Sequence, residues 1–231
     1  MRETKEIIIV RCNLFSHPTV LTGDLHTHGL HVFQMLQSYI DLKQFIVLSV
    51  GDMAGDGNKG TDADPSELYT FIKENSKSFY YVQGNHDLQS PGTVGNNIAD
   101  GTWVTTEIGK IGGVNGIISD KRRLYRLSEK EFIAHIKSLL NQNIKILLTH
   151  ETPALPVIDP MYKTPCIGQK SLFLTLRGNL VHVYGHCHHS EFYHYISGVH
   201  FINVDSRVII AIPEGHDESD LLLSEFVDLY M

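Results

Sequence analysis

Five short motifs hold most of the residues in this chain that could do chemistry. In order they are Asp24-Leu25-His26, Gly51-Asp52, Gly84-Asn85-His86-Asp87, Thr149-His150-Glu151 and Gly185-His186-Cys187-His188. Their carboxylates, amide and imidazoles, with no thiolate pattern, are ligands that suit Mn, Fe or Zn. A single D-x-H or H-x-H arises by chance in many chains, whereas the ordered set does not. The set predicts a two-metal hydrolytic site.

The spacing within the motifs agrees with metal binding. Asp24 and His26 are two residues apart, so in an extended segment their side chains project to the same side, and His186 and His188 share that spacing. The carboxylate of Asp52 can bridge two cations. Two divalent ions carry four positive charges and two aspartates cancel two of them, which leaves a charge that suits a bound phosphate. Two metals roughly 3.5–4 Å apart can activate water and stabilise the oxygens of an in-line displacement.

Each motif follows an apolar run that reads as a buried strand. Such runs are short, β-branched and bounded by polar or glycine residues. The predicted strands are residues 7–10, 19–22, 45–50, 79–82, 144–148, 180–184, 192–196, 200–204 and 208–212. Ligands of open α/β sheets bind outside the carboxyl ends of the strands. The five motif loops are therefore expected to converge on one edge.

Helices are predicted between these strands. An amphipathic stretch covers 30–42, and Ser128-Glu129-Lys130-Glu131 is a capping box that opens a helix running to Leu140. Asp64 is a predicted N-cap, with Pro65 at the first helical position. A helix over 170–177 is expected to stop at Gly178, and a last helix covers 219–229. The order indicates an α/β protein with mixed sheets.

Composition limits the class of protein. The chain has 231 residues, of which 42% are hydrophobic and 19% charged, and this fits one domain over residues 1–231. A net charge of −7 argues against a nucleic-acid polymer as partner. Three scattered cysteines suggest a reducing compartment, and the apolar run at 6–10 is too short for a membrane span. We expect a soluble, cytoplasmic protein of undetermined oligomeric state.

The ordered motifs resemble those of the calcineurin-like metallophosphoesterase superfamily, whose pattern runs D-x-H, G-D, G-N-H-[DE], H and G-H-x-H. The resemblance spans about residues 23–188. It implies a four-layer fold in which two mixed β-sheets pack as a sandwich flanked by helices. It also implies a dinuclear phosphoester hydrolase, a phosphatase or phosphodiesterase, in which a metal-bridging hydroxide attacks phosphorus. The ions are expected to be Mn, with Fe or Zn as alternatives.

The resemblance also implies a role for each motif residue. The first metal would be bound by Asp24, His26 and His188, and Asp52 would bridge the two ions. The ligands of the second metal would be Asn85, His150 and His186. His86 would stabilise the transition state or protonate the leaving oxygen, and Asp87 would orient His86 through a hydrogen bond. Substrate contacts would come from Asn85 and His86.

Neighbours of the motifs have competing interpretations. His28 either reaches the substrate or is a surface residue at a helix start. Asp56 and Glu151 either support the site or belong to their loops. By contrast, His189 is expected to face solvent and Cys187 to be a small buried residue. Residues Trp103, Tyr80 and Tyr81 are expected in the core. The glycine- and asparagine-rich segment 88–125 and the proline-rich segment 151–168 are expected to form opposite walls of the pocket.

Departures from the pattern leave the substrate open. Relatives in the phosphoprotein-phosphatase branch usually have Asp-Arg-Gly after Gly-Asp, whereas the segment Gly51–Gly57 contains no arginine. That branch uses arginine to hold phosphate bidentately. A metal-dependent phosphatase or phosphodiesterase is therefore the leading prediction. The alternatives are a serine/threonine-type protein phosphatase, a catalytically silent scaffold on the same fold, and a nuclease.

Overall fold

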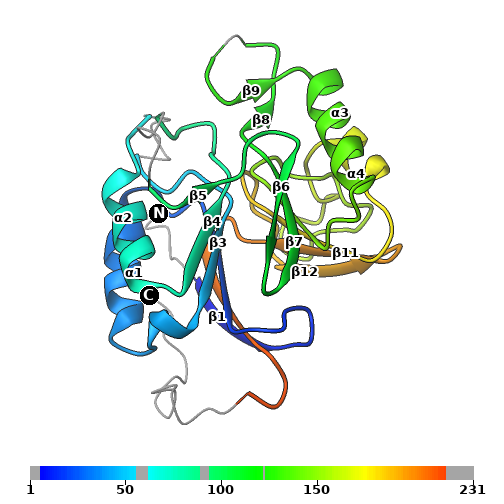
Figure 1. The fold of residues 1–231 in the computed structure, drawn as a ribbon. Coiled ribbons are helices and arrows are strands. Elements are labelled where there is room, and N and C mark those ends of the chain that lie inside the picture. The colour runs from blue at the N-terminus through cyan, green and yellow to red at the C-terminus, as the bar shows by residue number, and fades with distance from the viewer. Residues whose placement is uncertain (1–5, 56–61, 89–93, 122, 217–231) are drawn as a thin grey trace.

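The computed structural model describes residues 6–55, 62–88, 94–121 and 123–216, which form two large sheets and a small one (Figure 1). The first sheet has the order β1 (Glu6–Arg11), β14 (Arg207–Ile212), β2 (Thr19–Gly23), β3 (Ile46–Ser49), β4 (Ser78–Tyr81) and β5 (Asn96–Asn97). The second has the order β12 (Tyr193–Ile196), β13 (Val199–Asn203), β11 (Leu180–Tyr184), β10 (Ile146–Thr149), β7 (Gly109–Val114) and β6 (Thr102–Thr106). The small sheet pairs β8 (Ile117–Ile118) with β9 (Arg126–Leu127).

Helices cover the outer face of each large sheet. They are α1 (Gly29–Gln37), α2 (Ser66–Asn75), α3 (Glu129–Leu140) and α4 (Lys170–Thr175), with short 3-10 turns η1 (His26–His28) and η2 (Leu42–Gln44). Figure 1 shows α1 and α2 on one side of the molecule and α3 and α4 on the other. Within the described residues, no helix combines the length and apolar character needed to cross a membrane.

Three buried apolar clusters define four layers. One joins α1 and α2 to the first sheet and includes Phe33 and Tyr69. The second lies between the sheets and includes Leu21 and Leu148, and the third joins α3 and α4 to the second sheet around Phe132. Burial of apolar area is the main driving force for such packing. The structure thus confirms the predicted α/β class, with two mixed sheets packed as a sandwich flanked by helices.

Strand direction brings the motif loops to the same edges. In the first sheet β2, β3 and β4 are parallel neighbours, so their carboxyl ends lie together. In the second sheet β7, β10, β11 and β13 are parallel as well. The five motifs therefore follow the carboxyl ends of three strands of one sheet and two of the other, which positions one site where the sheets meet.

All nine strands predicted from the sequence are present, within two residues at each end. The main addition is β7, inside the segment 88–125 that was predicted as a pocket wall. The sequence did not predict β7 because its glycines are typical of loops. In the structure these glycines permit close packing on both faces of the strand. A Cβ at Gly112 would lie 2.8 Å from a methyl of Leu139, and one at Gly113 would lie 2.7 Å from a methyl of Val82. The segment completes the second sheet.

Helix boundaries differ from prediction where side chains cap the backbone. The predicted helix over 30–42 ends early, and Asp41 begins η2 by accepting a hydrogen bond from the backbone of Lys43. Asp64 does accept from the backbone of Ser66, although α2 begins one residue later than predicted, with Pro65 at the cap position. The capping box at Ser128 is confirmed. α4 ends at Thr175, before Gly178, and the helix predicted over 219–229 lies outside the described residues.

His182, in the middle of β11, gives folding stability a pH dependence. Its imidazole is fully buried against Tyr184 and Phe201, and its Nε2 lies 2.8 Å from the hydroxyl of Thr149. Burial lowers the pKa of His182 from 6.5 to about 3, so the unfolded chain takes up a proton that the folded protein refuses. The contribution of the neutral His182 to folding stability is complete above the unfolded pKa of 6.5. It is lost as pH falls from 6.5 toward 3, by at most about 1.4 kcal/mol per pH unit.

Urea unfolding measured at several pH values from neutral to mildly acidic checks this expectation. His182→Asn, which cannot take up the proton, is expected to flatten the fall in unfolding free energy toward low pH. A variant with the same slope as the wild type would show that other groups carry the effect.

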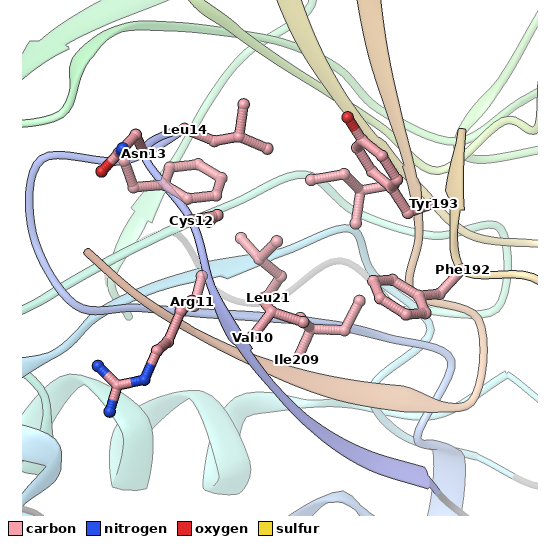
Figure 2. A pocket seen from close by; sticks show the side chains of 12 residues that line it. Val10, Arg11, Cys12, Asn13, Leu14, Leu21, Phe192, Tyr193 and Ile209 are labelled. Atoms are coloured by element: carbon pink, nitrogen blue, oxygen red, sulfur yellow. The ribbon is translucent and has the colours of Figure 1, made fainter. Parts of the chain in front are cut away.

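A cavity of about 410 Å³ lies at the edge of the sandwich, lined mainly by apolar side chains from the end of β1 and the loop after it, from β2, β13 and β14, and from the start of β12. Figure 2 shows Phe192 and Tyr193 facing Leu21 and Ile209 across it, with the guanidinium of Arg11 pointing away. Because β1 runs opposite to β2, the carboxyl end of β1 lies far from the loop that carries Asp24. The cavity is separate from the motif loops.

Candidate metal centre

Backbone hydrogen bonds tie the first two motif loops together. Asp24 N donates to Gly51 O at 3.0 Å, and His26 N donates to Asp52 O at 3.1 Å. The loops after β2 and β3 therefore hold each other in register. The carboxylates of both aspartates are buried at this junction.

The ligand atoms of Asp24, His26 and Asp52 converge, with one atom from each lying within 4.8 Å of the others. They do so from a folded backbone, since Asp24, His26 and Asp52 have φ values of 54°, 50° and 51°. The left-handed region costs a residue other than glycine roughly 1–2 kcal/mol. The predicted convergence is thus present, but the extended geometry proposed for Asp24 and His26 is wrong. Such strain at a cluster of ligands is typical of a functional site.

His150 directs one ring nitrogen at two oxygen acceptors. Its Nδ1 donates to Val50 O at 2.9 Å, which leaves Nε2 facing Asp52 Oδ2 at 3.1 Å and Asn85 Oδ1 at 3.2 Å. Burial alone would lower the pKa of His150, but the charges of Asp52 and Asp24 outweigh it and raise the pKa to about 10. A positive charge, from a proton or from a metal ion, is therefore favoured between these three side chains.

The two buried aspartates have different electrostatic environments. Burial and the like charge of Asp205 raise the pKa of Asp24 well above its usual value. Burial would raise the pKa of Asp52 too, yet the neighbouring His150 outweighs this and holds it well below the usual value. A site with this much buried negative charge is stabilised by bound cations.

Glycines precede Asn85 and His186 because the carboxylates lie against their backbone. A Cβ at Gly84 would lie 2.0 Å from Asp52 Oδ1, and a Cβ at Gly185 would lie 2.2 Å from Asp24 Oδ2. Neither glycine has a left-handed φ, so close approach alone requires it. The glycines of the third and fifth motifs therefore make room for the aspartates of the first and second.

His186 joins the cluster from the second sheet. Its backbone N donates to Asp24 Oδ2 at 3.1 Å, and its ring centre lies 5.2 Å from that of His150. Burial and the charge on His150 lower the pKa of His186 to about 4, which keeps its imidazole neutral. A neutral imidazole is the form that binds a metal.

His188 lies at the outer side of the site, in contact with two residues that sequence reasoning missed. Its Nδ1 is 3.7 Å from Asp205 Oδ2, and its Nε2 is 3.2 Å from a guanidinium nitrogen of Arg207. Arg207 is only 1% exposed and also donates to Asn203 and Glu6. It begins an apolar strand, so in the sequence it reads as an ordinary strand boundary.

His86 stands beside the cluster, with its ring centre 6.5 Å from that of His26 and its backbone N donating to Asp52 Oδ1 at 2.7 Å. Its Nδ1 lies 3.2 Å from Asp62 Oδ1. The resemblance predicted a hydrogen bond from Asp87 to the ring of His86, but in the structure the ring contacts Asp62 instead. Asp62 belongs to the polar segment before α2, and no motif signals it.

Asp87 connects the second and third motif loops instead. Its buried carboxylate accepts hydrogen bonds from the backbone N of Asp52 at 2.9 Å, Met53 at 3.2 Å and Gly84 at 2.8 Å. The side chain points inward because these three amides converge there. Burial and the charge of Asp52 raise the pKa of Asp87 to about 7.

The neighbours of the motifs divide between surface and core. His28 is exposed at the start of α1, and Glu151 is buried, accepting from the backbone of Ile118 and Thr152. His189 is 1% exposed, with its ring nitrogens near Tyr184 and Ile167, so its predicted exposure is wrong. The chain turns sharply after β11, which sends this ring inward.

The remaining residues near the motifs were expected in the core or beside the site. Cys187 is half-buried, and Trp103 is 39% exposed on β6 beneath Lys110, so its predicted place in the core is wrong. Tyr81 is buried and Tyr80 is half-buried, as expected of core residues. Asp56 lies outside the described residues.

The donor set fits divalent metal ions. Asp24, His26 and Asp52 offer three converging ligand atoms, while His150 and Asn85 add an imidazole nitrogen and an amide oxygen beside the same carboxylate. Mixed oxygen and nitrogen ligands of this kind suit Mn, Fe and Zn. The hydrogen bond from His150 to the carbonyl of Val50 fixes the ring that faces the site.

Comparisons with known proteins agree with the geometry. A family model described as calcineurin-like phosphoesterase matches residues 17–190. None of the curated proteins matches the chain in sequence. One crystal structure superposes with a TM-score of 0.59 at 11% identity, over 82% of this chain and 90% of that one. The crystal structure of TT1561 of Thermus thermophilus superposes with a TM-score of 0.51 at 13% identity, over 84% of this chain and 88% of that one. These two likenesses concern the fold.

Proposed function

The chain belongs to the calcineurin-like phosphoesterase family, and on that premise we propose that it hydrolyses phosphoesters at a site holding two divalent metal ions. The observation that carries the proposal is the convergence of Asp24, His26 and Asp52, with His150 facing the same carboxylate. Asp24, His26 and His188 would hold the first ion, and Asp52 would contribute to both. Three further residues, Asn85, His150 and His186, would hold the second ion.

The ions supply positive charge for the phosphoryl oxygens and a water of lowered pKa, and we expect Mn, with Fe or Zn as alternatives. Asp24 and Asp52, when ionised, cancel only half the charge of two divalent ions, so the site attracts a phosphate. Asn85 and His86 border that position, and His28 is the outer candidate for a substrate contact. The site suits monoesters and diesters alike, and the segment Gly51–Gly57 has no arginine of the kind that protein phosphatases carry after Gly-Asp.

His86 is proposed to donate a proton to the leaving oxygen, with Asp62 orienting its ring. His86→Ala is expected to lower kcat by about 100-fold or more, because proton transfer by a positioned side chain contributes that much. Asp62→Asn is expected to lower kcat by about 10-fold with little change in KM, and to shift the alkaline limb of the pH profile. Both rates are measured by ethanol release from ethyl phosphate and diethyl phosphate, whose alkoxide leaving groups require a proton.

Asp87→Asn is the matched control for Asp62→Asn, since it makes the same substitution at the residue beside His86 in the sequence. Asp87→Asn is expected mainly to lower folding stability, because the asparagine side chain has only one oxygen to accept hydrogen bonds from three buried backbone amides. If Asp87→Asn shifts the pH profile and Asp62→Asn does not, the assignment of the positioning residue is wrong.

Metal removal and return tests the proposed function as a whole. Protein dialysed against a chelator is expected to lose hydrolysis of 4-nitrophenyl phosphate and of its bis ester, and Mn is expected to restore it. Bound metal without turnover of any phosphoester would favour a silent scaffold. Full activity of the chelated, dialysed protein would exclude the proposal.

The proposal extends to the whole chain and its location. We expect residues 1–231 to act as one domain, because the family match already covers most of it. The three cysteines are free thiols, which accords with a reducing compartment such as the cytoplasm.

A further inference from the structure

Four large apolar side chains are exposed together in one loop between β10 and α4. Ile158, Met161, Tyr162 and Ile167 are 62%, 69%, 51% and 61% exposed. Single exposed apolar residues are common on protein surfaces, whereas a contiguous group marks a binding surface. We call residues 157–167 the apolar loop.

The apolar loop has a defined shape. Its two arms pair in antiparallel fashion, with Cys166 N donating to Val157 O at 3.0 Å and Asp159 N donating to Thr164 O at 2.8 Å. The buried carboxylate of Asp159 accepts from the backbone N of Met161 and Tyr162 at the turn. A loop with this many internal bonds presents its apolar side chains in fixed positions.

The same carboxylate ties the apolar loop to the last motif. Asp159 accepts from the backbone N of Ser190 at 2.8 Å and from its hydroxyl at 2.7 Å. The ring of His189 lies 2.9 Å from Ile167 O. The two residues that follow His188 are therefore both bonded to the apolar loop.

A pocket of about 330 Å³ lies between the apolar loop and this motif. Its lining includes Tyr162, Pro165, Cys166 and Ile167 on one side and His188 and His189 on the other. The volume is that of a small organic group, and ligand pockets are typically apolar with a few polar groups. Since His188 is a proposed metal ligand, the pocket and the proposed metal centre share this residue.

We propose that this pocket is a specificity subsite, which receives the organic group of the substrate, and that this group is an apolar alkyl or aryl alcohol esterified to phosphate. The inference rests on the proposed function. With the phosphoryl group bound at the proposed metal centre, the organic group would pass His188 and contact Tyr162 and Ile167, which line the same pocket. A polar alcohol such as glycerol leaves these side chains in water and gains nothing there.

Paired substrates with equal leaving groups test the subsite. The monoester pair is ethyl and hexyl phosphate, and the diester pair is ethyl methyl and hexyl methyl phosphate. The members of each pair differ only in apolar length, and the pair used is the one that the Mn-loaded wild type hydrolyses. The wild type is expected to prefer the hexyl ester in kcat/KM by about 10-fold or more. The double variant Tyr162→Ser with Ile167→Ser is expected to lose that preference through KM, with kcat/KM for the ethyl ester unchanged.

Leu174→Ser is the matched control, because Leu174 is 65% exposed but lies on α4, outside the pocket. It is expected to keep the wild-type preference. A second measurement is direct binding: hexylphosphonate should bind the Mn-loaded wild type about 10-fold more tightly than methylphosphonate, and the double variant should bind both equally.

The outcomes separate the two proposals. An unchanged hexyl preference in an active double variant overturns the subsite and leaves the proposed function intact. A second outcome also overturns the subsite: the wild type binds phosphatidylglycerol vesicles, and the double variant loses this binding but keeps the hexyl preference. The apolar loop would then dock on a membrane. Absence of hydrolysis of every ester by the Mn-loaded wild type overturns the proposed function instead.

Discussion

Asp52→Asn is expected to lower the rate of metal-dependent phosphoester hydrolysis by at least about 1,000-fold. The reason is that one carboxylate would serve both proposed ions, and the charge stabilisation that such ions give the transition state is worth several kcal/mol. Asp52 lies 3.1 Å from His150 Nε2 and shares a cluster with Asp24 and His26, so its carboxylate contacts residues of both proposed ligand sets. The rate is measured with the nitrophenyl esters in saturating Mn.

Asp64→Asn is the control for this prediction. It removes the same charge from an exposed residue just before α2, and the asparagine oxygen can accept the same hydrogen bond from the backbone of Ser66. Activity of Asp64→Asn is expected to equal that of the wild type. If Asp52→Asn keeps more than about a tenth of wild-type activity, the bridging role of Asp52 is wrong.

Gly84→Ala is expected to have a comparably large effect through geometry alone. The added carbon would lie 2.0 Å from Asp52 Oδ1 and 2.4 Å from Asp52 N, so both the carboxylate and its backbone must move. Overpacking at such a site costs about 1–3 kcal/mol of stability, and displacement of Asp52 should weaken metal binding and activity about 100-fold. Thermal unfolding and Mn titration measure the two effects.

Gly178→Ala separates the clash from a general intolerance of alanine. Gly178 has φ of +88° and nothing within 4 Å of the added carbon, so this variant should cost only about 1 kcal/mol of conformational strain. Its metal binding is expected to be unchanged. Normal metal binding in Gly84→Ala would show that the loops after β3 and β4 are less rigidly packed than the structure indicates.

The sequence could predict where the site lies because the strands have short apolar runs with polar ends. Each motif was expected after such a run, and the register of β2, β3 and β4 then places Asp24, Asp52 and Asn85 at one edge. This inference needs only strand direction and the rule for α/β sheets.

The backbone conformation of the ligands could not be predicted from the same pattern. Spacing suggested an extended Asp24-Leu25-His26 segment, but Asp24 and His26 are left-handed. Tertiary hydrogen bonds to the carbonyls of Gly51 and Asp52 hold them there, and these partners are distant in the sequence. The same applies to β7, whose glycines read as loop signals until the facing side chains are known.

Partners of the motif residues were equally hidden. Asp62 contacts His86 and Arg207 contacts His188, yet neither belongs to a motif. Asp87 was expected to orient the ring next to it, whereas its carboxylate meets three backbone amides that only the folded loops bring together. Side-chain direction in these loops depends on the fold as a whole, so local spacing does not define it.

The most direct test of the account is the number of metal ions bound per chain. Equilibrium dialysis of chelator-treated protein against Mn, followed by elemental analysis, is expected to give two ions per wild-type chain and a clear loss in Asp52→Asn. Two ions accord with the ligand sets centred on Asp24 and on His150, joined by Asp52. A wild-type chain that binds no divalent ion, or an Asp52→Asn chain that binds two as tightly, would contradict it.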